Sequence, residues 1–169
     1  MPIEIERKFL VRERRIALPE RSEPIDQGYL TATSPVVRVR RMGDRGYLNI
    51  KSKQLPPGTV LEGIAAEVAR AEYEYEIPLR DALELLALCP WKLVKRRHYF
   101  EGGFEYDVFA GALDGLELLE YESHTPEDMP ATPDGLVLEE VTGDPRFSNI
   151  RMALGELPAN LAELRVRLG

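Results

Sequence analysis

Charged residues at alternating positions, repeated along most of the chain, constrain the fold more than any other feature of this sequence. On a β-strand successive side chains point to opposite faces, so residues at i and i+2 share a face. In the run from Ile3 to Val11, Glu4, Glu6 and Lys8 therefore lie on one face and mainly apolar residues on the other. One strand of this kind is typical of a solvated sheet face. The pattern recurs down the chain, however, and each segment tends to keep one sign of charge.

Similar alternation predicts a series of further strands. They cover residues 25–31, 36–41, 47–53, 72–77, 92–100, 104–109, 116–122 and a short segment at 139–142. The basic faces of these segments carry Arg38, Arg40, Lys51, Lys53, Lys95 and Arg97. The acidic faces carry Glu72, Glu74, Glu76, Glu105, Asp107, Glu120 and Glu122.

Helical segments are few. Residues 81–88 begin with an acidic residue, continue as a short apolar run and are closed by Pro90, which predicts a helix. The tail from Ser148 has leucines at roughly helical spacing and predicts an amphipathic C-terminal helix interrupted by Pro158. Between the strands, residues 54–69 start with a proline and glycine cluster and predict a long surface loop.

Composition excludes several classes of protein. With 169 residues, 44% of them hydrophobic, the chain fits one domain over 1–169 with a core of its own. The net charge of −7 argues against a nucleic-acid binder. Cys89 is the single cysteine, so we expect neither an intramolecular disulfide nor a thiolate metal cluster. No stretch has the length of a membrane span and no signal peptide is evident, so we expect a soluble cytoplasmic protein.

Two arrangements of the charged faces are consistent with this pattern. Either the faces are solvated, or the sheet closes into a barrel whose charged faces line a central cavity. Enclosed charges would have to pair, remain hydrated or hold a highly charged ligand, because an unpaired buried ion costs several kcal/mol. The basic faces would suit a polyphosphate chain, and the acidic faces would suit hard divalent cations.

The segment Glu4-Ile5-Glu6-Arg7-Lys8 resembles the ExExK signature of the CYTH superfamily, the triphosphate tunnel metalloenzymes. The resemblance continues in the expected order along nearly the whole chain, and it is closest to the small bacterial members that hydrolyse inorganic tripolyphosphate. The matching segments are Gln27-Gly28-Tyr29-Leu30, Arg38-Val39-Arg40, Lys51-Ser52, Glu74-Tyr75-Glu76-Ile77, Lys95-Arg96-Arg97, Asp107-Val108-Phe109-Ala110-Gly111, Glu120-Tyr121-Glu122 and Glu140-Val141-Thr142-Gly143-Asp144-Pro145-Arg146-Phe147.

This resemblance implies an α+β fold with an eight-stranded, antiparallel, closed β-barrel and a few flanking helices, one of them C-terminal. It also implies Mg²⁺ or Mn²⁺ as cofactor and a small molecule containing a triphosphate as substrate. The implied metal ligands are Glu4, Glu6, Glu120 and Glu122, with Asp107 near a second ion. The implied phosphate-binding residues are Arg38, Arg40, Lys51, Lys95 and Arg97. Glu74 and Glu76 could bind a metal or orient the lysines and arginines opposite them, and we favour the second role, with Glu105 as a further supporting residue.

The resemblance further implies that Lys8 is catalytic and acts together with Tyr29. Neighbouring cations and partial burial would lower the pKa of this lysine, so that it could accept a proton from the attacking water. The leading hypothesis is therefore a metal-dependent tripolyphosphatase that could also act on nucleoside triphosphates. The alternatives are an adenylyl cyclase of the class IV type and a polyphosphate-binding or nucleotide-binding module without turnover. The sequence leaves the physiological substrate open, and equally whether the protein forms a homodimer.

Overall fold

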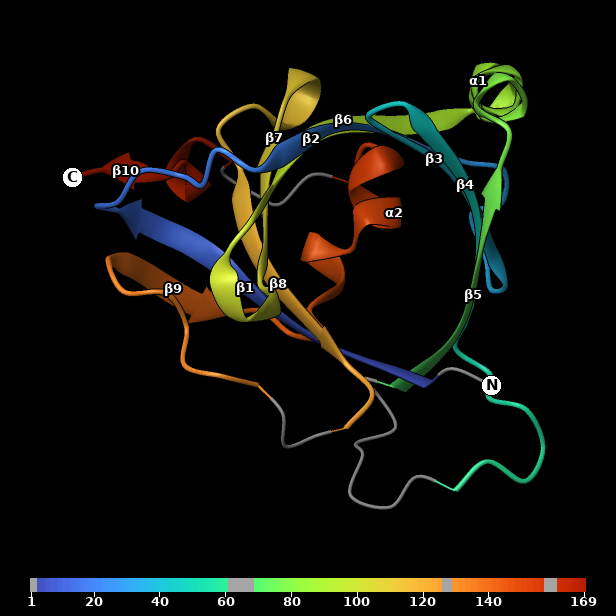
Figure 1. The fold of residues 1–169 in the computed structure, drawn as a ribbon, viewed down its shortest axis with the longest axis horizontal. Coiled ribbons are helices and arrows are strands. Elements are labelled where there is room, and N and C mark those ends of the chain that lie inside the picture. The colour runs from blue at the N-terminus through green and yellow to red at the C-terminus, as the bar shows by residue number, and fades with distance from the viewer. Residues whose placement is uncertain (1–2, 61–68, 126–128, 157–160) are drawn as a thin grey trace.

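The computed structural model describes residues 3–60, 69–125, 129–156 and 161–169. Within this part of the chain, eight strands close into an antiparallel barrel in the order β1-β5-β4-β3-β2-β6-β7-β8, with β8 paired back to β1 (Figure 1). The predicted barrel is confirmed. Its strands are β1 (Ile3–Arg14), β2 (Ser22–Tyr29), β3 (Val36–Met42), β4 (Arg45–Ser52), β5 (Ala69–Ile77), β6 (Trp91–Tyr99), β7 (Glu105–Phe109) and β8 (Glu117–Ser123).

Two short strands extend the sheet beside the barrel. β9 (Leu136–Glu140) pairs antiparallel with the second half of β1, and β10 (Arg167–Leu168) pairs parallel with its end. The first strand is longer than predicted because these partners extend it from Val11 to Arg14. For the same reason the last predicted strand lies at 136–140 rather than 139–142, in register with the extension of β1.

The helices are α1 (Leu79–Leu88) and α2 (Asn149–Ala153). The prediction of a longer amphipathic tail is only partly right: α2 is short, residues 161–164 form a separate 3₁₀ turn, and Leu157 lies outside the described residues. Half of the predicted loop at 54–69, residues 61–68, also lies outside them, and Ala69 already belongs to β5. Among the described residues, no helix is long and apolar enough to cross a bilayer.

Helix α1 packs on the outer face of the barrel. It follows Pro78 and ends before Pro90, and its buried residues Ala82 and Leu86, one turn apart, contact Val39 of β3. The approach is close: a Cβ at Gly46 of β4 would lie 2.5 Å from the Cβ of Ala82. A glycine is therefore needed where the helix crosses β4.

One end of the barrel interior is filled by an apolar core. Leu10, Leu93 and Leu118 point inward from β1, β6 and β8 and pack with Met152 of α2 and with Phe147. Figure 1 shows α2 within the ring of strands. The inward-facing residues beyond this core are polar and charged, so the barrel interior divides into an apolar layer and a charged cavity.

Candidate active site

The charged cavity occupies the barrel interior and has a volume of about 440 Å³. The inward faces of the strands supply most of its wall, and the segments 32–36 and 141–151 complete it. Of the predicted site residues, those that line the cavity are Glu4, Glu6, Lys8, Tyr29, Arg38, Arg40, Lys51, Lys95, Arg97, Glu120 and Glu122. The alternating charges of the sequence therefore face inward, and of the two arrangements the closed one is present.

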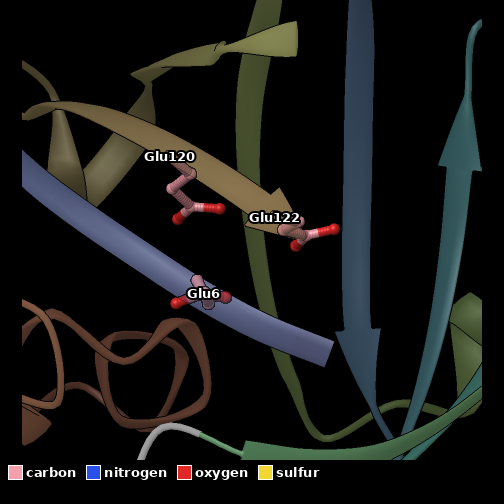
Figure 2. A group of neighbouring side chains, drawn as sticks. All are labelled: Glu6, Glu120 and Glu122. Carbon is pink, nitrogen blue, oxygen red and sulfur yellow. The ribbon is translucent and has the colours of Figure 1, made fainter. Parts of the chain in front are cut away.

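Three carboxylates converge on one side of the cavity. Figure 2 shows Glu6 projecting from β1, and Glu120 and Glu122 from the adjacent β8. One carboxylate oxygen from each lies within 4.8 Å of the others. Glu6 and Glu122 stand directly opposite each other across the β1–β8 ladder, a placement of like charges that destabilises a sheet unless a cation offsets it. An all-carboxylate donor set suits a hard divalent cation, so these three residues fit such an ion.

Glu6 is ionised at neutral pH. Burial raises its pKa, but the positive charges of Lys8 and Lys51 outweigh this effect and lower the pKa to about 2. Glu4 lines the same cavity but does not join the three converging carboxylates. Burial and the carboxyl group of Glu72 raise the pKa of Glu4, so these two groups share a proton.

Lys8 lies between two of the three carboxylates. Its Nζ is 3.1 Å from Glu6 Oε1 and 3.3 Å from Glu120 Oε1, and it donates to the carbonyl oxygen of Phe147 at 3.2 Å. Burial lowers the pKa of this lysine, but the charges of Glu120 and Glu6 reverse the effect and hold the pKa well above the ordinary 10.5. The prediction of a lowered lysine pKa is therefore wrong, because the charges of two nearby carboxylates outweigh the effect of burial. Lys8 is an ammonium ion in this structure.

Basic residues from β3, β4 and β6 also line the cavity, and Lys51 and Arg97 lie within 4 Å of Glu6 and Glu120 respectively. Lys51 Nζ is 2.9 Å from Glu72 Oε2, and Arg38 Nη2 is 3.4 Å from Glu72 Oε1. Arg40 differs from both, because no described carboxylate forms an ion pair with it. Its Nη1 contacts the sulfur of Met42 at 3.5 Å, and its Nε is buried without a hydrogen-bond partner among the described residues. Burial lowers the pKa of Arg40, and the nearby guanidinium groups of Arg38 and Arg97 lower it further. Arg40 is thus a buried cation that forms no ion pair with any described carboxylate.

Lys95 and Arg97 reach the cavity from β6 and are held from behind by Asp107 of β7. Asp107 is fully buried and accepts from Arg97 Nε at 2.7 Å, from Arg97 Nη2 at 2.9 Å and from Lys95 Nζ. Glu105 forms an ion pair with Arg97 Nη1. Asp107 and Glu105 do not line the cavity, so the structure does not support the prediction that Asp107 lies near a second metal ion.

The acidic face of β5 behaves as a support. Glu74 accepts from Asn49 Nδ2 at 3.2 Å and lies 3.8 Å from Arg38, while its role in orienting the bases stays a prediction. Glu76 is exposed, and no described cation forms an ion pair with it. The residue in closest contact with the bases is Glu72, which bonds Lys51, Arg38 and Asn49.

Some lining residues are not among the predicted site residues. Arg70 and Asn49 line the cavity, as do Asn149 and Arg151 of α2. Arg70 has the same parity as Glu72, Glu74 and Glu76, so alternation would have identified it if the strand had been started at Ala69. No period-two pattern marks the α2 residues, because their position depends on how the tail folds into the barrel.

Replacing Asp107 by asparagine should lower the free energy of unfolding by about 3 kcal/mol, because two buried cations lose their shared counter-ion. Burial raises the pKa of Asp107, but Arg97 and Lys95 outweigh it and hold the pKa well below the ordinary 3.8. The ionised form therefore stabilises the fold above pH 3.8, and this stability is lost as the pH falls below that value. Urea unfolding of both proteins between pH 3 and 7 measures the effect.

The matched control is Asp26→Asn, which removes the exposed partner of Arg41, 2.9 Å away, and should cost less than about 1 kcal/mol. Two results would show that Asp107 does not support the two bases. One is an equal loss of unfolding free energy in both variants, and the other is a loss of stability at acidic pH in Asp107→Asn that equals that of the wild type.

Comparison with known proteins gives consistent matches. The family model described as the CYTH domain matches residues 2–148. The inorganic triphosphatase of Acetivibrio thermocellus is 36% identical over 152 residues, which cover 86% of this chain and 90% of that protein. The inorganic triphosphatase of Nitrosomonas europaea is 32% identical over 162 residues, covering 89% and 97% of the two chains. The crystal structure of the inorganic triphosphatase NE1496 superimposes with a TM-score of 0.58 at 32% identity, over 89% of this chain and 94% of that one.

Proposed function

This chain belongs to the CYTH domain family, and from that premise we propose that it hydrolyses inorganic triphosphate with the help of a divalent metal ion. The observation that carries the proposal is the presence, in one cavity, of three converging carboxylates and a buried guanidinium that forms no ion pair within the described part of the chain. The charge of the carboxylates is offset by a bound cation, and the charge of the guanidinium is offset by a bound anion. A metal-bound triphosphate satisfies both, and the relatives named above are inorganic triphosphatases.

We assign Mg²⁺ or Mn²⁺ to the group formed by Glu6, Glu120 and Glu122, with Glu4 beside it. These carboxylates would hold the ion, which would supply Lewis-acid stabilisation of the charge that develops on the leaving group. We assign no metal ion to Asp107, because its oxygens are already engaged by Lys95 and Arg97.

The basic residues of the cavity bind the phosphates. Arg38, Arg40 and Arg97 present planar guanidinium groups that match phosphate oxygens, and Lys51 and Lys95 add point charges. Hydrolysis requires that the oxygen of a water attack a terminal phosphorus while the bond from that phosphorus to the bridging oxygen breaks, which releases orthophosphate and pyrophosphate. The transition state of phosphoryl transfer is loose, so positioning and charge stabilisation contribute more than a strong base.

Lys8 is suited to charge stabilisation. Its ammonium group separates Glu6 from Glu120 and faces the same cavity as Arg40. We therefore assign it the role of a fixed positive charge beside the reacting phosphate, which replaces the base suggested by the sequence.

An assay of the purified protein with Mg²⁺ or Mn²⁺ tests the proposal. With tripolyphosphate, we expect orthophosphate and pyrophosphate to appear together in equal amounts. With ATP, cyclic AMP and pyrophosphate would indicate an adenylyl cyclase instead. Tight binding of tripolyphosphate without any product would indicate a binding module.

Replacing Arg40 by alanine should raise KM for tripolyphosphate at least about tenfold and also lower kcat, because the guanidinium contacts the substrate before and during the reaction. The matched control is Arg41→Ala, since Arg41 is the next residue on β3, points to the other face and pairs with Asp26. Steady-state kinetics of the two variants give the comparison. If KM and kcat of Arg40→Ala are unchanged, Arg40 does not bind substrate.

A further inference from the structure

Gln27 is a buried polar residue that the proposed reaction leaves without a role. It lies on β2, two residues before Tyr29, so both side chains point into the barrel. Only 1% of Gln27 is exposed, and unlike Tyr29 it does not line the cavity. Gln27 therefore lies behind the cavity wall, where it can affect the substrate only through a neighbour.

The backbone at this point has little freedom to shift. Gly28 separates the two residues and faces the outer side, against the end of α1. A Cβ at Gly28 would lie 2.7 Å from the Cβ and the Sγ of Cys89. β2 thus packs against the end of α1 on its outer side. This contact restricts the position of the β2 backbone that carries Gln27 and Tyr29.

The contact between the two side chains is a short hydrogen bond. Gln27 Nε2 donates to Tyr29 Oη at 2.6 Å, so the hydroxyl oxygen is an acceptor and keeps its own proton for another partner. No described residue accepts that proton. The charged groups that act most strongly on this hydroxyl are Arg38, Arg40 and Lys8, all of them cations that offer no acceptor.

The orientation of the Gln27 amide agrees with its surroundings. Gln27 stands opposite Arg40 across the β2–β3 ladder, and its Oε1 is buried without a hydrogen-bond partner among the described residues. Because Arg40 can only donate, a carbonyl oxygen on that side of Gln27 avoids the conflict of two donors that an NH₂ group would create. The reversed amide would accept the hydroxyl proton of Tyr29 and leave none for the cavity, so the two orientations predict opposite effects on function.

We propose that Gln27 is a positioning residue, whose amide fixes the Tyr29 hydroxyl as a hydrogen-bond donor aimed at a phosphate oxygen of the bound triphosphate. The proposal rests on the function proposed above and extends it by one residue. Tyr29 contacts the substrate, and Gln27 acts only through Tyr29. The cavity thereby gains one neutral, directional donor among its cations.

The test is a double-mutant cycle of Gln27→Met and Tyr29→Phe, assayed with tripolyphosphate and Mg²⁺ or Mn²⁺. Methionine is close to glutamine in size and cannot donate to the hydroxyl. We expect Gln27→Met to lower kcat about tenfold with KM changed less than about threefold, as for one lost hydrogen bond in the transition state. In the Tyr29→Phe background the same substitution should change kcat less than about twofold, because the hydroxyl that Gln27 donates to is already absent.

Stability separates this role from a structural one. Methionine also removes the unpartnered Oε1, so the melting temperature of Gln27→Met should equal or exceed that of the wild type while kcat falls. Gln54→Met, at an exposed position, is the matched control and should leave kcat unchanged.

Three results would overturn the inference: wild-type kcat in Gln27→Met, an equal loss of kcat in the Tyr29→Phe background, or a loss of kcat that accompanies a lower melting temperature. If the wild-type protein binds tripolyphosphate without hydrolysing it, the proposed function fails, and the same cycle is measured as affinity by calorimetry. Non-additive losses of affinity would then support the role of Gln27, and additive losses or none would refute it.

Discussion

Replacing Glu6 by alanine should reduce the rate of tripolyphosphate hydrolysis at least about a hundredfold. Glu6 supplies one of the three carboxylates that fit a divalent cation, and it is ionised because Lys8 and Lys51 lower its pKa to about 2. Its loss removes one cation ligand and one of the acceptors that hold Lys8. Higher concentrations of Mg²⁺ or Mn²⁺ should recover part of the rate, since a weakened site still fills by mass action.

Glu139→Ala is the matched control, because Glu139 is an exposed carboxylate of β9 that pairs with Arg12 outside the barrel. Steady-state rates of the two variants over a range of metal concentrations give the answer. Wild-type rates in Glu6→Ala at every metal concentration would show that Glu6 of β1 takes no part in the reaction.

Replacing Lys8 by alanine should also reduce the rate at least about a hundredfold, for a different reason. The substitution removes the ammonium that lies between Glu6 and Glu120 and faces the cavity. The charge on the transferred phosphoryl group then loses a fixed cation, and the two carboxylates lose the positive charge that separates them. Because the deficit is not a missing metal ligand, added metal should not restore the rate.

Lys92→Ala provides the control for charge and length, since Lys92 belongs to β6 but is exposed. The pH dependence of kcat distinguishes the two roles of Lys8. A lysine that acts as a base must be neutral, so it predicts a loss of activity as the pH falls through its lowered pKa, whereas a fixed cation predicts no such loss. Unchanged rates in Lys8→Ala would refute both roles.

The strand alternation predicted which residues face inward, because parity is a local property of each strand. It could not give the register between strands, and register decides the roles. Asp107 has the same strand parity as the site residues. It lies opposite Arg97 on the neighbouring β6, however, and its carboxylate is hydrogen-bonded to that arginine. Lys8 stands opposite Glu120 on β8, which raises its pKa where the sequence suggested that cations would lower it.

The tail shows a second limit of sequence patterns. Leucine spacing from Ser148 predicted an amphipathic helix interrupted by Pro158, whereas α2 covers only five residues and Met152 packs inside the barrel. That position depends on contacts with Leu10 and Leu93, which are remote in sequence. For the same reason, no local pattern could have identified Asn149 as a neighbour of Lys95, 3.3 Å away.

A crystal structure of the protein with tripolyphosphate and Mn²⁺ tests the central claim most directly. The account predicts an anomalous peak for manganese between Glu6, Glu120 and Glu122, and a phosphate group bound to the guanidinium of Arg40 in the same cavity. Tripolyphosphate bound on the outer surface, or manganese bound away from these carboxylates while the cavity stays filled with water, would contradict it.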